Sequence, residues 1–138
     1  MSEPKCPFSM LQAAGACRCG QAREVVRRGG SEYDCTDPGK HAHCLALTQH
    51  LNTVALSALG YEDDLTQTPK SVYERVLLGG LRGLRGNAPA DDDTPITDIW
   101  RVVEAALERH GAPERVPETE FVPAIEACEI RKRRRKAR

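Results

Sequence analysis

Apolar residues recur at intervals of three and four along the segment 44–59, which is the pattern of one buried helix face. The repeating positions are Cys44, Leu47, Leu51, Val54, Ala58 and Leu59. Gly60 follows directly, and glycine commonly ends a helix because it adopts the left-handed conformation without strain. The pattern predicts a helix over 44–59, with Cys44 in its first turn and on its apolar face.

A second helix is predicted to start after Pro69, with Ser71 near its cap, and to weaken at Gly79-Gly80. The run Gly80-Leu-Arg-Gly83-Leu-Arg-Gly86 follows, and its backbone N–H groups and arginines could surround an anion. No strand precedes this run, however, and no Lys-Ser/Thr pair follows it, so it does not match a phosphate loop. We expect a frayed helix end there, followed by a flexible basic loop.

Two more helices are expected near the C-terminus. Thr94 is a good N-cap and Pro95 a good first helical residue, and the apolar positions after them continue until Gly111. A last helix is predicted to run from about Pro123 into the C-terminal tail. These signals indicate a body built from packed helices.

The first 44 residues contain scattered glycines and are expected to form loops and short helices. The segment 19–28 is interpreted as one short helix that ends at Gly29-Gly30, and the segment 31–38 as a loop that carries Cys35. No alternating strand pattern stands out in the sequence. The predicted fold class is therefore all-α: a small helical bundle with a cysteine-rich, loop-containing N-terminal region that holds a metal cluster.

Composition narrows the class of protein. The chain has 138 residues, of which 40% are hydrophobic and 29% charged, as is typical of one globular domain. No apolar run is long enough to span a membrane, and no secretory signal is visible, so a cytoplasmic location is expected. We expect a single domain over 1–130, with a cysteine-rich head (1–44), a helical body (45–130) and a basic tail (131–138).

Cysteine placement gives the strongest indication of chemistry. Five of the six cysteines lie in the first 44 residues, namely Cys6, Cys17, Cys19, Cys35 and Cys44. An odd number is unsuited to a disulfide framework, and a reducing cytoplasm disfavours one. Clustered cysteines in an intracellular protein more often bind metal, although free cysteines also occur as small buried apolar residues. Cys128 stands apart and is expected to be an ordinary core or surface thiol.

The spacing favours an iron–sulfur cluster over zinc. Only one close pair exists, Cys17-Arg18-Cys19, whereas zinc sites commonly use two short pairs. Loops of different lengths can supply four thiolates to a [4Fe-4S] cluster. On the expected helix 19–28, Cys19 shares a face with apolar residues. This favours a ligand set made of Cys6, Cys19, Cys35 and Cys44. Cys17 is then a spare thiol or an alternative ligand, and a helix that started at Gly20 would remove this distinction.

Alternatives to this ligand set remain open. His41 and His43 directly precede Cys44 and could complete a mixed Cys/His zinc site, but we interpret them as helix-capping or supporting residues. Cys17 and Cys19, beside Arg18, could form a redox dithiol or a Cu(I) site. The redox dithiol and the Cu(I) site both leave Cys6, Cys35 and Cys44 unexplained.

Charge is segregated although the net charge is zero. Residues 91–130 carry three basic and eleven acidic side chains, and the tail carries seven basic ones and no acidic one. The tail could contact nucleic acid through phosphates, or fold back onto the acidic run Asp91–Asp93. A solvated tail is the usual outcome for such a charge run.

The function predicted from these patterns is that of a small cytoplasmic iron–sulfur protein. It would bind one [4Fe-4S] cluster and act in electron transfer to a larger redox enzyme, or in the maturation of that enzyme. The alternatives are a redox- or oxygen-sensing regulator whose tail contacts nucleic acid, and a structural zinc module that mediates protein contacts. No catalytic motif is present, so nothing in the sequence argues for an enzyme.

Overall fold

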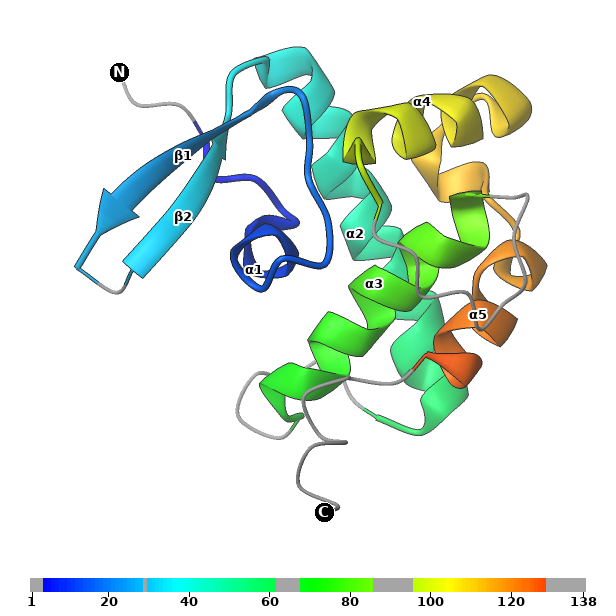
Figure 1. Ribbon diagram of the computed structural model, residues 1–138. Coiled ribbons are helices and arrows are strands. Elements are labelled where there is room, and N and C mark those ends of the chain that lie inside the picture. Colours follow the sequence, from blue (N-terminus) through cyan, green and yellow to red (C-terminus); the bar gives the residue numbers. More distant parts are fainter. Residues whose placement is uncertain (1–3, 29, 62–67, 86–95, 129–138) are drawn as a thin grey trace.

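Helices make up most of the computed structural model, which describes residues 4–28, 30–61, 68–85 and 96–128 (Figure 1). In chain order the elements are α1 (Ser9–Ala13), β1 (Ala22–Arg27), β2 (Gly30–Cys35), α2 (Pro38–Leu59), α3 (Lys70–Arg85), α4 (Ile99–His110), the 3-10 turns η1 (Pro113–Arg115) and η2 (Glu118–Glu120), and α5 (Val122–Ala127). The mostly helical architecture is confirmed. The all-α prediction is wrong in one respect, because the head contains a two-stranded sheet.

The two strands form an antiparallel hairpin where the sequence suggested a short helix and a loop. Their register runs from Ala22 opposite Cys35 to Arg27 opposite Gly30, so only two residues connect them. Gly30 has a φ of +118°, which glycine adopts readily, and such short connections are typical of hairpins. Val25 and Val26 are β-branched and favour an extended chain. Gly30 is therefore the first residue of β2 and does not follow a helix end.

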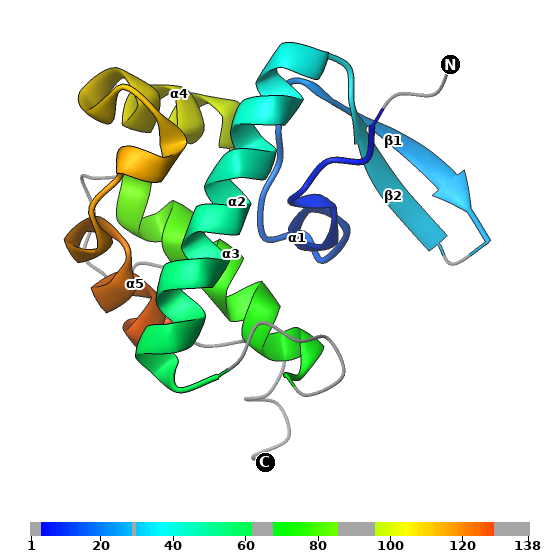
Figure 2. The ribbon, with the colours of Figure 1, turned by 180° about the vertical axis from the view of Figure 1, so that it is seen from behind.

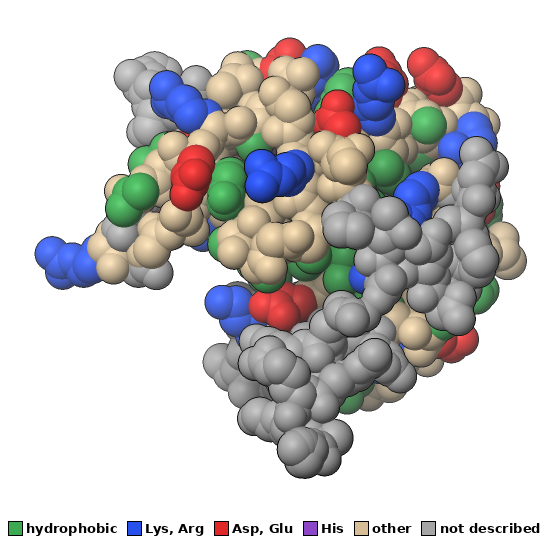
Figure 3. All heavy atoms as spheres, in the orientation of Figure 1, with side chains coloured by type: hydrophobic (Ala, Val, Ile, Leu, Met, Phe, Trp, Pro, Cys, Tyr) green, Lys and Arg blue, Asp and Glu red, His purple; other side chains and the backbone are tan. Residues whose placement is uncertain are grey.

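The hairpin projects from the helical body as an arm, which both ribbon views show (Figures 1 and 2). Basic and hydrophobic side chains lie along this arm in the space-filling view (Figure 3). Val26 is 79% exposed, whereas Val25 on the opposite face of the strand is half-buried. Val25 and Val26 thus lie on opposite faces of the strand, as neighbouring residues of a strand do.

Helix α2 begins earlier than the apolar pattern predicted. Asp37 caps it, because its carboxylate accepts hydrogen bonds from the N–H groups of Gly39 and Lys40 at 3.0 and 3.1 Å. Pro38 then occupies the first turn, where its missing N–H has no cost. The predicted end at Gly60 is confirmed, with a φ of +86°. Cys44 consequently lies in the second turn of α2, and its placement in the first turn is wrong.

Helix α3 continues through the glycines at which it was expected to weaken, so the frayed end and basic loop predicted over 80–86 are wrong as far as Arg85. A Cβ atom on Gly79 would lie 2.6 Å from Cα of Ile125, and one on Gly83 would lie 2.5 Å from the carbonyl oxygen of Glu120. The glycines therefore let α5 and η2 approach the backbone of α3 closely. Gly86 lies outside the described residues.

Helix α4 begins at Ile99, with Asp98 at the N-cap position, and ends at Gly111 as predicted. The expected cap and first residue, Thr94 and Pro95, lie outside the described residues. The predicted start is nevertheless wrong, because Ile96 forms a bridge with Cys17 and is not helical. A helix near Pro123 is confirmed as α5, but it ends at Ala127 and does not run on into the tail. The tail 131–138 and the acidic run Asp91–Asp93 also lie outside the described part of the chain.

The core lies between α2, α3, α4 and α5. Its largest fully buried side chains come mainly from these helices and include Leu47, Leu51, Leu81, Ile99 and Phe121. The head contributes Phe8 to the same core. Among the described helices, none combines the length and the apolar character needed to cross a membrane.

Candidate metal centre

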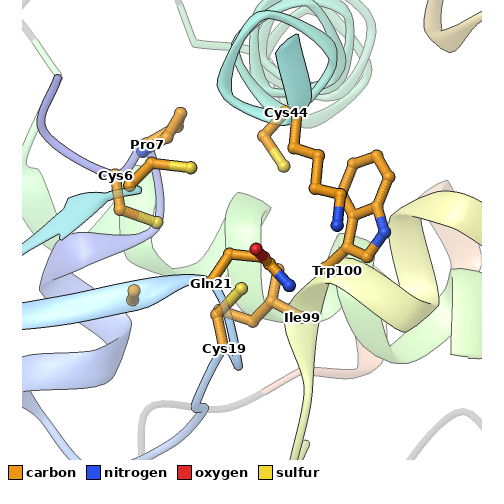
Figure 4. Close-up of a pocket in the computed structure, with 10 residues that line it drawn as sticks. Cys6, Pro7, Cys19, Gln21, Cys44, Ile99 and Trp100 are labelled. Atoms are coloured by element: carbon orange, nitrogen blue, oxygen red, sulfur yellow. The ribbon is translucent and has the colours of Figure 1, made fainter. Parts of the chain in front are cut away.

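Four cysteines line one small cavity at the junction of head and body. Cys6 precedes α1, Cys19 lies in the loop before β1, Cys35 is the last residue of β2, and Cys44 lies in α2. Figure 4 shows the sulfur atoms of Cys6, Cys19 and Cys44 pointing toward a common space. The structure therefore brings together the four cysteines that the sequence analysis selected.

Backbone pairing along β2 places two of these cysteines side by side. The N–H of Cys6 donates to the carbonyl of Tyr33, and the N–H of Cys35 donates to the carbonyl of Pro4, each at 2.8 Å. Lys5 forms an antiparallel bridge with Asp34 between them. The N-terminal segment thus pairs with the outer edge of β2 through an isolated bridge, which places the two cysteines next to each other.

Hydrogen bonds reach the sulfurs of this pair. The Cys6 sulfur accepts from the N–H of Phe8 at 3.4 Å and from the side-chain amide of Gln12 at 3.3 Å. The Cys35 thiol donates to the carbonyl oxygen of Asp37 at 3.3 Å. Donors aimed at a sulfur stabilise its negative form, which is the form that binds metal.

The loop that carries Cys19 is held against the start of α4. The N–H of Arg18 donates to the carbonyl of Ile96 at 2.9 Å, and the N–H of Ile99 donates to the carbonyl of Arg18 at 2.7 Å. The carboxylate of Asp98 accepts from the N–H of Gly20 at 3.0 Å. These contacts fix Cys19 at the N-terminal end of α4.

The N-terminal turn of α4 directs a hydrogen bond at the Cys19 sulfur. Backbone hydrogen bonds from Gln21 and Trp100 lower the pKa of Cys19, although burial outweighs them and leaves the pKa raised. Trp100 is the second residue of α4, where the N–H groups have no partner within the helix. A free N–H group of a helix start therefore lies beside Cys19.

Burial keeps the thiols of Cys6, Cys19 and Cys44 protonated near neutral pH. It raises the pKa of Cys6 to about 11 and also raises the pKa of Cys19 and of Cys44. After burial, the charges that raise the pKa of Cys44 are those of Cys6, Cys19 and Cys35. The four thiols therefore form one electrostatic group, and metal that binds them must displace their protons.

Cys17 belongs to a different environment. It is buried but does not line the cavity, and its backbone pairs with Ile96. Burial raises the pKa of Cys17 to about 12. The charges of Arg82 and Arg85 act in the opposite direction, and those of Cys6 and Cys128 raise this pKa further. The helix that was used to choose Cys19 over Cys17 does not exist, because that segment forms a loop and β1. Backbone contacts with α4 separate the two thiols instead.

Neither Cys128 nor the paired histidines line the cavity. Cys128 is a buried core thiol, and the Arg82 guanidinium lies 3.6 Å from its sulfur. His41 and His43 both lie inside α2, so the expectation that they cap the helix is wrong. His41 forms a hydrogen bond with the carbonyl of Lys5 at 3.1 Å, and the ring of His43 lies 6.3 Å from that of Trp100.

The space between the four thiols is narrow. It has a volume of about 10 Å³, which is room for about one water molecule. The non-atom space among its lining residues is about 300 Å³, part of it open to solvent. A cluster of four irons and four sulfides fits this donor set, but binding would require the surrounding loops to move apart.

Single-ion and cluster sites place their sulfurs differently. Four thiolates around one tetrahedral zinc lie about 3.8 Å apart, because each Zn–S bond is about 2.3 Å. In a [4Fe-4S] cluster each thiolate binds a different iron, so the sulfurs lie farther apart. Within the described residues, no group of three or more His, Cys, Asp or Glu side chains is arranged to hold one metal ion.

Several residues of the site had no signal in the sequence. The remaining lining residues are Pro7, Gln21, Ala22, Lys40, Ile99 and Trp100. Trp100 is the only tryptophan of the chain, which could have marked it for attention, but it was assigned simply to an apolar helix face. Comparisons with protein-family models, with curated protein sequences and with solved structures found no match for this chain.

The metal-free protein is expected to lose stability as the pH rises from about 9 to about 12. The pKa values of Cys6 (about 11) and Cys17 (about 12) lie above their ordinary value of 9.0. Between pH 9 and the raised pKa of each thiol, the folded protein keeps the thiol proton that the unfolded protein has lost. The stabilisation that comes from burying the protonated thiols is therefore complete below pH 9. It is lost as the pH rises through the pKa values of Cys6 and Cys17 in the folded state.

Urea unfolding at several pH values, followed by far-UV circular dichroism, measures this effect. Lysines and tyrosines also titrate in this range, so Cys17→Ala serves as the comparison. Its unfolding midpoint should depend less on pH than that of the unmodified protein. Equal pH dependence in the two proteins would contradict the assignment.

Proposed function

We propose that this protein binds one [4Fe-4S] cluster through Cys6, Cys19, Cys35 and Cys44 and exchanges single electrons with a larger redox enzyme, or assists in its maturation. One observation carries this proposal: thiols from four separate segments line the same cavity and form one electrostatic group. Thiolates are soft ligands, and four of them are the usual ligand set of such a cluster.

The residues around the thiols are suited to tuning an electron carrier. A bound cluster would supply one-electron chemistry, and its potential depends on burial and on hydrogen bonds to sulfur. Here Phe8 and Gln12 donate to Cys6, and the start of α4 donates to Cys19. These donors favour the more negative, reduced state, whereas the apolar walls disfavour added charge.

One wall of the cavity is suited to electron exchange. Ile99 and Trp100 close one side of it. An electron can cross such a wall, but a substrate cannot.

Metal analysis of protein purified without air tests the proposal. We expect about four irons and about four acid-labile sulfides per chain, as the cluster requires, with broad visible absorption that bleaches on reduction. Reduction should also produce a low-temperature EPR signal. Colourless protein that contains zinc would support the structural zinc module instead, and protein with neither metal would refute both.

A further inference from the structure

The wall of the thiol cavity is also the floor of a surface hollow. This hollow has a volume of about 450 Å³ and is lined by Asp37, Gly39, Lys40, His43, Trp100, Glu104, Leu107 and Glu108. Only Lys40 and Trp100 are shared with the lining of the thiol cavity. The two spaces are therefore adjacent, and these two side chains separate them.

Trp100 is held in this position from two sides. The ammonium of Lys40 lies 5.2 Å from the centre of the indole ring, within the range of a cation–π contact. The ring of His43 lies 6.3 Å away in a tilted arrangement. Figure 4 shows Trp100 beside the space into which Cys19 and Cys44 point. The half-buried indole is thus in contact with the thiol cavity on one side and with the hollow on the other.

The rim of the hollow is acidic. Asp37, Glu104 and Glu108 outnumber the one lysine, and Glu104 and Glu108 are exposed one turn apart on α4. Among the residues that the structure describes, no ion pair involves either glutamate. Trp100 and Leu107 provide an apolar floor. An apolar centre with a charged rim is the usual composition of a transient protein interface.

We propose that this hollow is the docking site of a redox protein with a basic surface, and that electrons pass between the cluster and that partner across Trp100. The inference rests on the proposed function. In each encounter the reduced cluster loses one electron and the acceptor centre of the partner gains it, with no bond formed and no proton transferred. The acidic rim attracts the basic partner, and the indole lies between the thiols and the docked surface because it lines both spaces.

Electron transfer to cytochrome c, a small basic haem protein, tests this assignment. The cluster is first reduced without air, and the appearance of reduced cytochrome c is then followed by stopped-flow absorption at low salt. The double variant Glu104→Gln/Glu108→Gln should lower the second-order rate constant about fivefold, because electrostatic steering is lost. At about 1 M salt, where charges are screened within about 3 Å, the difference should disappear.

A matched control changes the net charge by the same amount at a surface away from the hollow. Glu114→Gln/Glu118→Gln removes two exposed acidic charges that line neither cavity, and it should slow the reaction less than twofold. With ferricyanide, an anionic acceptor, the Glu104→Gln/Glu108→Gln variant should react faster than the unmodified protein. Equal slowing of both double variants with cytochrome c would overturn the docking site.

The metal content of the same samples separates the two proposals. If iron and sulfide are present but the rates do not distinguish the variants, only the docking site is refuted. If iron and sulfide are absent, the cluster proposal fails, and the docking proposal fails with it.

Discussion

Cys44→Ser is expected to abolish the visible absorption of the proposed cluster and to reduce bound iron and sulfide to a small fraction of the four of each that the cluster requires. The sulfur of Cys44 points into the cavity that three other thiols line. Serine keeps the size of the side chain but offers a hard oxygen ligand in place of a soft thiolate. The same loss is expected for Cys6→Ser, Cys19→Ser and Cys35→Ser.

Cys17→Ser is the matched control, because Cys17 is at least as buried as Cys44, with exposed fractions of 1% and 6%. It should retain the absorption, as should Cys128→Ser. Iron, sulfide and the visible spectrum are compared at equal protein concentration, with far-UV circular dichroism as a check on folding. If Cys17→Ser lost the absorption and Cys19→Ser kept it, Cys17 would be the ligand. Loss in all six variants would indicate a general effect on folding.

Gly83→Ala is expected to destabilise the protein by about 3 kcal/mol, which is the upper end of the range for overpacked cores. The new Cβ would lie 2.5 Å from the carbonyl oxygen of Glu120 and 2.9 Å from Cα of Phe121. Both are backbone atoms, so rotation of a side chain cannot relieve the contact. The cost should exceed the gain of about 1 kcal/mol in helix propensity from glycine to alanine.

Gly39→Ala provides the comparison, since Gly39 is also helical but lies exposed near the start of α2. A Cβ there would approach only the side chain of Asp37, at 3.4 Å. This variant should be neutral or slightly more stable than the unmodified protein. Urea unfolding gives both free energies, and a similar value for the two variants would contradict the close packing of α3.

The sequence predicted those helix ends that depend on local backbone conformation. Gly60 and Gly111 both end helices with φ close to +86°, and both were identified from the chain alone. The helix starts were less accurate. For α2 the apolar repeat began well after the cap, and the signal that was overlooked is Asp37-Pro38, a capping residue followed by a proline.

The hairpin could not be recognised because its determinants are not local. The segment that contains Val25 and Val26 is short enough to suit either a helix or a strand. Pairing with β2 decides between them, and β2 is supported on its other edge by Pro4 and Cys6. The helix predicted over 19–28 considered this segment alone, without its pairing to β2 or the support of β2 by the N-terminal segment.

The cysteines indicated the candidate site, but the surroundings of the thiols could not be derived from the sequence. Cys19 reaches the cavity because Asp98 and Ile96 hold its loop from a segment almost eighty residues later. The donors to sulfur from Gln12 and Trp100 likewise depend on the tertiary arrangement. The spacing of cysteines along the chain indicates which thiols can bind one group together. The hydrogen-bond donors to their sulfurs and the residues that enclose the cavity depend on how distant segments pack.

Large buried side chains are unevenly distributed between the segment that supplies most of the cysteines and the helices, so a group bound in the thiol cavity would link two parts of unequal packing. Three of the cavity's four cysteines come from residues 4–35, yet among the described residues of this segment only Phe8 is a large and fully buried side chain. A group bound by all four sulfurs would therefore act as a cross-link between this lightly packed N-terminal segment and the well-packed helices. Much of the binding free energy of such a group would stabilise the folded conformation of residues 4–35.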